Sequence, residues 1–307
     1  MKIILILIAA LSLTPSSAAW ATTSPGPVCE ASWVDSARTR TVPVRIRMPE
    51  GSGKVPVILF SHGLGGSVDS GMLWAQAWAS AGFAVVNLQH PGSDRSILRG
   101  GAVRGAMSPQ QLVSRITDVH FVIDELGRKG REGACDLSRL DLSRIGMSGH
   151  SFGAHTTQAV AGQHFPMAGS DGFTDTRVKA AIAFSPSPPF RGSAEAAFAD
   201  VYIPFFSITG TDDSVPLTPQ IRPADRERPY RAMPPGGKYL LVLDGATHMD
   251  FNGRGDGRPA PNAHIQAVVI DATIAFWRWT LLGDEAAKRQ LDADDVGLVA
   301  GDRLEHR

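Results

Sequence analysis

Three residues in this sequence have types and an order suited to nucleophilic catalysis. Ser151 lies within the glycine-flanked segment 149–153, directly after an apolar run, and His248 and the pair Asp212 and Asp213 follow two other apolar runs. A serine hydroxyl becomes an effective nucleophile when a histidine removes its proton. A carboxylate then fixes the tautomer of that histidine and stabilises its protonated form. The order Ser, Asp, His therefore predicts a catalytic triad of Ser151, one of the two aspartates and His248.

The catalytic candidates all follow segments that are predicted to be strands. Segment 38–50 alternates apolar and charged residues, and the other predicted strands are more continuously apolar: 54–66, 83–94, 144–149, 177–187, 203–213 and 238–250. Helical spacing and start signals predict helices over 70–82, 108–130, 151–162 and 262–283. This alternation predicts an α/β fold with a mainly parallel central sheet and helices on both faces. Ligands bind such sheets beyond the carboxyl ends of the strands, where the candidates lie.

Five short motifs carry a resemblance to a known family. They are SHGLGG at 61–66, QHPGSD at 89–94, GHSFGAHT at 149–156, TGTDD at 209–213 and ATHMDF at 246–251. The strand, Gly-His-Ser-Phe-Gly and helix resemble the nucleophile elbow of α/β-hydrolases. Over roughly residues 38–282, the set resembles secreted bacterial hydrolases grouped with plasma-type platelet-activating-factor acetylhydrolases and described as dienelactone-hydrolase-like. Dienelactone hydrolases use a cysteine nucleophile, so Ser151 weighs against that activity while leaving the implied α/β-hydrolase fold unchanged.

The resemblance implies a role for each site residue. Ser151 would be the nucleophile and His248 the base, and the pattern Gly-Thr-x-Asp favours Asp213 as the acid, with Asp212 as the alternative. The backbone N–H groups of Leu64 and Phe152 would bind the oxyanion. The implied reaction is hydrolysis of carboxylic esters through an acyl-enzyme, with no cofactor and no metal.

The N-terminus has the layout of a secretory signal peptide. Lys2 precedes an apolar run over residues 3–13, which is too short to cross a bilayer, and small residues around position 21 predict cleavage there. We therefore expect export to the periplasm or the medium. In an oxidising compartment Cys29 and Cys135 would form a disulfide, the alternative being two buried thiols. No histidine lies at ligand spacing from either cysteine, which argues against a zinc site.

The rest of the chain sets bounds on organisation and partners. After the signal peptide (1–21) we expect an N-terminal segment (22–37), one catalytic domain (38–283) and a polar, frayed tail (284–307). The formal net charge is 0, which removes the usual reason to expect a nucleic acid or an anionic membrane as partner. The segment 187–202 is too short for a large lid domain. We expect a small-molecule or polymeric ester as substrate, no stable membrane insertion, and leave the oligomeric state open.

Two alternatives remain at this point. The narrower one uses the same machinery on lipids, as a phospholipase or acetylhydrolase, or on polyesters. The other is of a different class: a hydrolase-like binding protein that lacks catalytic activity.

Overall fold

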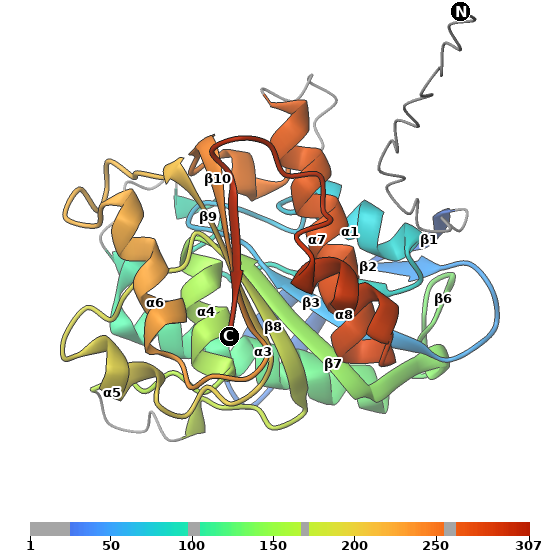
Figure 1. The fold of residues 1–307 in the computed structure, drawn as a ribbon. Coiled ribbons are helices and arrows are strands. Elements are labelled where there is room, and N and C mark those ends of the chain that lie inside the picture. Colours follow the sequence, from blue (N-terminus) through green and yellow to red (C-terminus); the bar gives the residue numbers. More distant parts are fainter. Residues whose placement is uncertain (1–24, 98–104, 167–171, 255–261) are drawn as a thin grey trace, which may run out of the picture.

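The core of the fold is a large, mostly parallel sheet. A computed structural model describes residues 25–97, 105–166, 172–254 and 262–307 (Figure 1). Within these residues nine strands pair side by side in the order β1 (Pro25–Asp35), β2 (Arg40–Pro49), β4 (Ala84–Leu88), β3 (Val55–Ser61), β7 (Leu140–His150), β8 (Val178–Phe184), β9 (Phe205–Asp212), β10 (Lys238–Thr247) and β11 (Arg303–His306). The strands from β4 to β10 in this order run parallel. The edge strands β1 and β11, and the second strand β2, are antiparallel to their neighbours.

Helices cover both faces of this sheet (Figure 1). One face carries α1 (Met72–Ser80), α7 (Ala263–Leu282) and α8 (Glu285–Asp292), and the other carries α3 (Pro109–Arg128), α4 (Phe152–Val160), α5 (Ala194–Phe198) and α6 (Arg228–Ala232). Strand β3 shows the division, because Ile58 and Phe60 pack with α1 and α7 whereas Val57 and Leu59 pack with α3. This two-residue alternation is what a strand buried on both faces requires.

The predicted alternation of strands and helices is confirmed, and local signals explain several boundaries. The hydroxyl of Ser108 accepts a hydrogen bond from the N–H of Gln111 at the start of α3, with Pro109 in the first turn. Gly283 ends α7 in a left-handed conformation with φ 72°. Only the short α5 lies in the connection between β8 and β9, where the sequence left little room for a lid.

The two terminal segments differ from expectation. Residues 25–35, expected only as part of an N-terminal segment, form the edge strand β1, and the predicted signal peptide lies outside the described residues. The expectation of a frayed tail over 284–307 is wrong. Ala287 and Leu291 of α8 are fully buried and β11 pairs with β10, so 238–250 is not the last strand. Ala287 and Leu291 are spaced i, i+4 on the buried face of α8, and the charged residues around them make this apolar signal weak in the sequence.

Helix α7 is long and apolar enough, by length and composition alone, to cross a membrane. Here it lies against the sheet, and Trp277 packs in the core with Trp78 of α1. A buried core helix of this kind has the same composition as a membrane span, because both are apolar on most sides.

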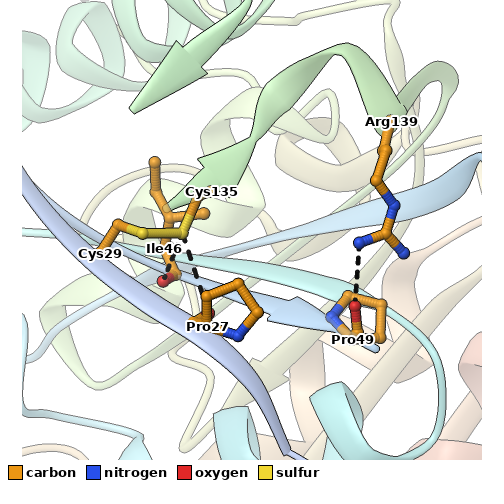
Figure 2. The surroundings of a disulfide bond; sticks show 6 residues. All are labelled: Pro27, Cys29, Ile46, Pro49, Cys135 and Arg139. Carbon is orange, nitrogen blue, oxygen red and sulfur yellow. Dashed lines mark hydrogen bonds between the residues drawn. A yellow bond between two sulfur atoms is a disulfide. The ribbon is translucent and has the colours of Figure 1, made fainter. Parts of the chain in front are cut away.

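A disulfide joins β1 to the hairpin that precedes β7 (Figure 2). The hairpin consists of β5 (Arg131–Glu132) and β6 (Cys135–Asp136), and the predicted bond between Cys29 and Cys135 closes a loop of 106 residues. Nearby, the guanidinium of Arg139 donates a hydrogen bond of 3.1 Å to the carbonyl oxygen of Pro49. Disulfides persist in oxidising, non-cytoplasmic compartments, and the bond indicates such a compartment for this protein.

We predict that replacing both cysteines by alanine lowers stability without changing turnover. Disulfides typically contribute about 2–4 kcal/mol, so the melting temperature should fall by roughly 5–15 °C. The length of β7 separates Cys135 from Ser151, so kcat at 25 °C should stay within about twofold of wild type. Thermal melts followed by circular dichroism, together with ester turnover, test this. A double variant that melts like wild type would contradict the stabilising role.

Candidate active site

Ser151 occupies a sharp turn between β7 and α4. Its backbone has φ 56° and ψ −114°, a conformation that is rare outside glycine and that clusters at functional sites. Steric contacts require the glycines on either side. A Cβ at Gly153 would lie 1.9 Å from the carbonyl oxygen of Ser61, and one at Gly149 would lie 2.4 Å from the carbonyl oxygen of Gly153. The turn is therefore built on two positions that accept only glycine, and it holds the serine at the carboxyl end of β7.

Asp213 and His248 form a direct hydrogen bond at the ends of β9 and β10. The Nδ1–H of His248 donates to Oδ1 of Asp213 at 2.7 Å. Asp213 is fully buried, and its Oδ2 accepts a second hydrogen bond of 2.8 Å from the hydroxyl of Thr209. Asp212 is exposed to solvent. Of the two candidate acids, the structure brings Asp213 to the histidine and leaves Asp212 outside.

A buried cation completes the surroundings of this carboxylate. Arg226 is only 2% exposed, its Nε lies 2.9 Å from Oδ1 of Asp213, and the same Nε donates to the backbone oxygen of Asp213. Its Nη1 donates to the carbonyl oxygen of Ser185, so it connects the loops after β8 and β9. Burial alone would raise the pKa of Asp213, but the hydrogen bond from His248 and the charge of Arg226 lower it below its ordinary value. The carboxylate is therefore ionised at neutral pH.

Ser151 and His248 open onto the same pocket, which has a volume of about 350 Å³ and which we call the catalytic pocket. Because Nδ1 of His248 binds Asp213, Nε2 is the ring nitrogen that remains to exchange a proton with a substrate or a nucleophile. The His248 side chain is 12% exposed, so a molecule in the pocket can reach it. The pocket thus combines a strained serine with an oriented histidine.

The loop after β3 forms a neighbouring wall of the catalytic pocket. Gly63 and Leu64 line it, and a Cβ at Gly63 would lie 3.4 Å from Cβ of Ser151. Within the described part of the chain, the backbone N–H groups of Leu64 and Phe152 donate no hydrogen bond, and the latter is a free donor because it begins α4. The two N–H groups that the sequence singled out are therefore available to bind an anionic oxygen.

Arg115 of α3 anchors this loop from inside the protein. It is fully buried and its Nη2 donates to the hydroxyl of Ser61, at 2.9 Å, and to the carbonyl oxygen of His62. Its Nε donates to the hydroxyl of Thr156 in α4 at 3.0 Å, and its guanidinium lies 4.6 Å from the ring centre of Phe152. Burial lowers the pKa of Arg115 to about 9, which leaves it protonated at neutral pH. The Arg115 side chain thus fixes the position of the loop after β3 relative to α4.

His62 and His90 belong to the same buried network. The Nδ1–H of His62 donates to the carbonyl oxygen of Gly63 at 2.6 Å, and its Nε2 accepts from the backbone N–H of His90 at 3.0 Å. His90 in turn bonds to Asp118 through Nδ1 at 3.0 Å. Burial and the nearby charge of Arg115 lower the pKa of His90 to about 4, so it is neutral. Both histidines hold the loop in place and neither opens onto the catalytic pocket.

His150, the second residue of the Gly-His-Ser-Phe-Gly motif, packs against the ring of His248 and bonds to its backbone. Its Nε2 lies 2.9 Å from the carbonyl oxygen of His248 and must carry the proton, because a carbonyl oxygen only accepts. The two ring centres are 4.6 Å apart. Burial and the charge that His248 can carry lower the pKa of His150 to about 3, so the His150 ring is neutral at neutral pH.

Three charged residues of this site were missed by the sequence analysis: Arg115, Asp118 and Arg226. Arg115 left a signal, because it lies on the apolar stripe of α3 beside Leu112, where a charged side chain must find buried partners. Arg226 left none. It lies in a segment, 222–231, with several arginines and acids, and nothing in the sequence distinguishes it from its exposed neighbours.

Neither a metal site nor a known relative explains this arrangement. Among the described residues, no group of three or more His, Cys, Asp or Glu side chains is arranged to hold a metal ion. No protein-family model matches the chain, and no curated protein matches it.

We predict that Asp213→Asn is far more damaging to ester hydrolysis than Asp212→Asn. Only Asp213 contacts His248, and loss of an orienting carboxylate can reduce kcat by about 10⁴. Asp212→Asn is the matched control and should stay within about threefold of wild type, since the exposed carboxylate at the end of β9 contributes little. Steady-state kinetics of both variants, with melting curves to show that each is folded, decide the point. Equal effects of the two substitutions would remove Asp213 from the triad.

Proposed function

We propose that the chain has the α/β-hydrolase fold and is an exported serine hydrolase of carboxylic esters. The observation that carries the proposal is the bond from His248 to the buried Asp213 beside a pocket that Ser151 also lines. The elbow between β7 and α4 and the chain order Ser, Asp, His support the same conclusion. The reaction needs no cofactor or metal, because all its acid, base and donor groups come from the chain.

In the proposed acylation step, Nε2 of His248 takes the proton of Ser151 while Oγ attacks the carbonyl carbon of the ester. The carbonyl oxygen becomes negative and binds the N–H groups of Leu64 and Phe152. Asp213 stabilises the imidazolium that has formed. His248 then gives its proton to the leaving alcohol, and the acyl group stays on Ser151 as an ester.

Deacylation repeats the sequence with water as the nucleophile. His248 removes a proton from water, the hydroxide attacks the acyl-enzyme, and the proton returns to Oγ of Ser151 as the acid leaves. Arg226 touches no reacting atom. It is a positioning residue, because it holds the Asp213 loop through backbone and carboxylate contacts.

Two alternatives differ in what they predict. A lipid or polyester hydrolase would use the same triad on a narrower set of esters. An inactive binding protein would occupy the catalytic pocket without turnover, and it leaves the strained serine and the free N–H donors without a role. The disulfide and the predicted signal peptide favour the periplasm or the medium for either activity.

Ser151→Ala should fold normally and lose nearly all hydrolysis of p-nitrophenyl acetate. Removal of the nucleophile from a serine hydrolase can reduce kcat by about 10⁶. Ser143→Ala, which alters an exposed serine near the other end of β7, is the control and should match wild type. Turnover by Ser151→Ala above a few per cent of wild type would exclude the proposed nucleophile, and an inactive wild-type protein would favour the binding protein.

A further inference from the structure

A second, larger pocket lies directly beyond the nucleophile. It has a volume of about 460 Å³, and its largely apolar lining includes Met107, Leu112, Phe152, Phe165, Pro189 and Phe190. We call these six residues and the space between them the aromatic pocket. A small cavity of about 40 Å³, which we call the connecting cavity, shares Met107 and Phe152 with the aromatic pocket and Leu64 and Ser151 with the catalytic pocket. Ser151 therefore lines two of three neighbouring cavities that share wall residues.

Three walls of the aromatic pocket are fixed by contacts within the chain. Leu112 and Phe152 belong to the core and are 5% and 4% exposed. Phe190 is 61% exposed, yet its ring stacks on His155 with ring centres 5.1 Å apart and an angle of 17° between planes. Burial, together with the charges of Arg226 and Arg115, lowers the pKa of His155 to about 4, so Phe190 rests on a neutral ring. The stacking thus fixes an exposed aromatic ring at the edge of the aromatic pocket.

The position of His248 tells which part of an ester this pocket receives. His248 must reach the leaving oxygen to protonate it, so the alcohol lies on the His248 side of Ser151. His248 lines the catalytic pocket but neither the connecting cavity nor the aromatic pocket. The acyl group then extends the other way, past the N–H groups of Leu64 and Phe152 that bind its carbonyl oxygen. That direction leads through the connecting cavity into the aromatic pocket.

Resting on the proposed function, we propose that the enzyme is specific for esters of large apolar acids, whose acyl group fills the aromatic pocket. The volume lies within the range of pockets that bury whole small molecules, and an acetyl group would leave it empty. A straight alkyl chain and an aryl group share the apolar character that the lining requires. The relative rates of octanoate and benzoate hydrolysis distinguish an alkyl acid from an aryl acid.

The first test varies the acyl group of p-nitrophenyl esters from acetate to octanoate, with benzoate as the aryl member. Each methylene buried in the pocket can raise kcat/KM by up to about fourfold, so octanoate should exceed acetate by roughly 100-fold or more. Benzoate above octanoate would identify an aryl acid as the preferred acyl group, and the reverse an alkyl acid. A second series, acetate esters of alcohols from ethanol to octanol, should be much flatter.

The second test changes one wall of the aromatic pocket. Phe190→Ala should reduce the ratio of kcat/KM for octanoate over acetate by about tenfold, and Phe190→Leu should restore most of it, because the alkyl contact returns. Tyr202→Ala, another aromatic residue that is 70% exposed but lines neither pocket, should leave the ratio at the wild-type value.

Different results would overturn the acyl assignment and the proposed function. If wild type hydrolyses acetate through Ser151 but shows no gain with acyl length, the proposed function survives and the acyl assignment is overturned. A steep dependence on alcohol length instead of acyl length overturns it as well, as does an unchanged ratio in Phe190→Ala. If wild type hydrolyses none of the esters, the proposed function fails, and the specificity fails with it.

Discussion

The close approach of α4 to the end of β3 is the constraint on which the site depends. The first turn of the helix presses against the backbone of Ser61 so tightly that Gly153 has no room for a Cβ. Ser151 adopts its positive φ next to this contact, and Gly63 of the loop after β3 lies beside the serine. The proposed nucleophile and the proposed oxyanion donors thus lie around one packing contact.

Two buried arginines fix the loops of the site relative to the contact between α4 and β3. Arg115 binds the loop after β3 and α4, and Arg226 binds the loops after β8 and β9. Burying a cation is costly. Replacing Arg226 would remove the donor to three carbonyl oxygens, and replacing Arg115 would remove the donor to one carbonyl oxygen and three hydroxyl oxygens. Asp118 and Asp213 offset part of this cost, Asp118 near Arg115 and Asp213 in direct contact with Arg226. The charge of Arg226, together with the hydrogen bond from His248, also keeps the pKa of Asp213 below its ordinary value.

Much of this architecture could be predicted from the sequence, because apolar runs and glycines report local requirements. The parallel strands, the turn at Ser151 and the disulfide between Cys29 and Cys135 belong to that class. The edge strands β1 and β11 could not be predicted, since an edge strand is only half buried and its pattern is weak. Arg226 and the aromatic pocket depend on how distant loops meet, and a linear sequence carries no record of such contacts.

The central claim is that Ser151 is an activated nucleophile, and covalent trapping tests it most directly. A fluorophosphonate reacts with a serine that a histidine deprotonates, and it leaves unactivated hydroxyls unmodified. Incubation of the folded, disulfide-bonded protein at neutral pH, followed by peptide mass spectrometry, would locate the adduct. The account predicts one adduct, on the peptide that contains Ser151, and none in Ser151→Ala. A folded protein that remains unlabelled, or that is labelled at another residue, would contradict it.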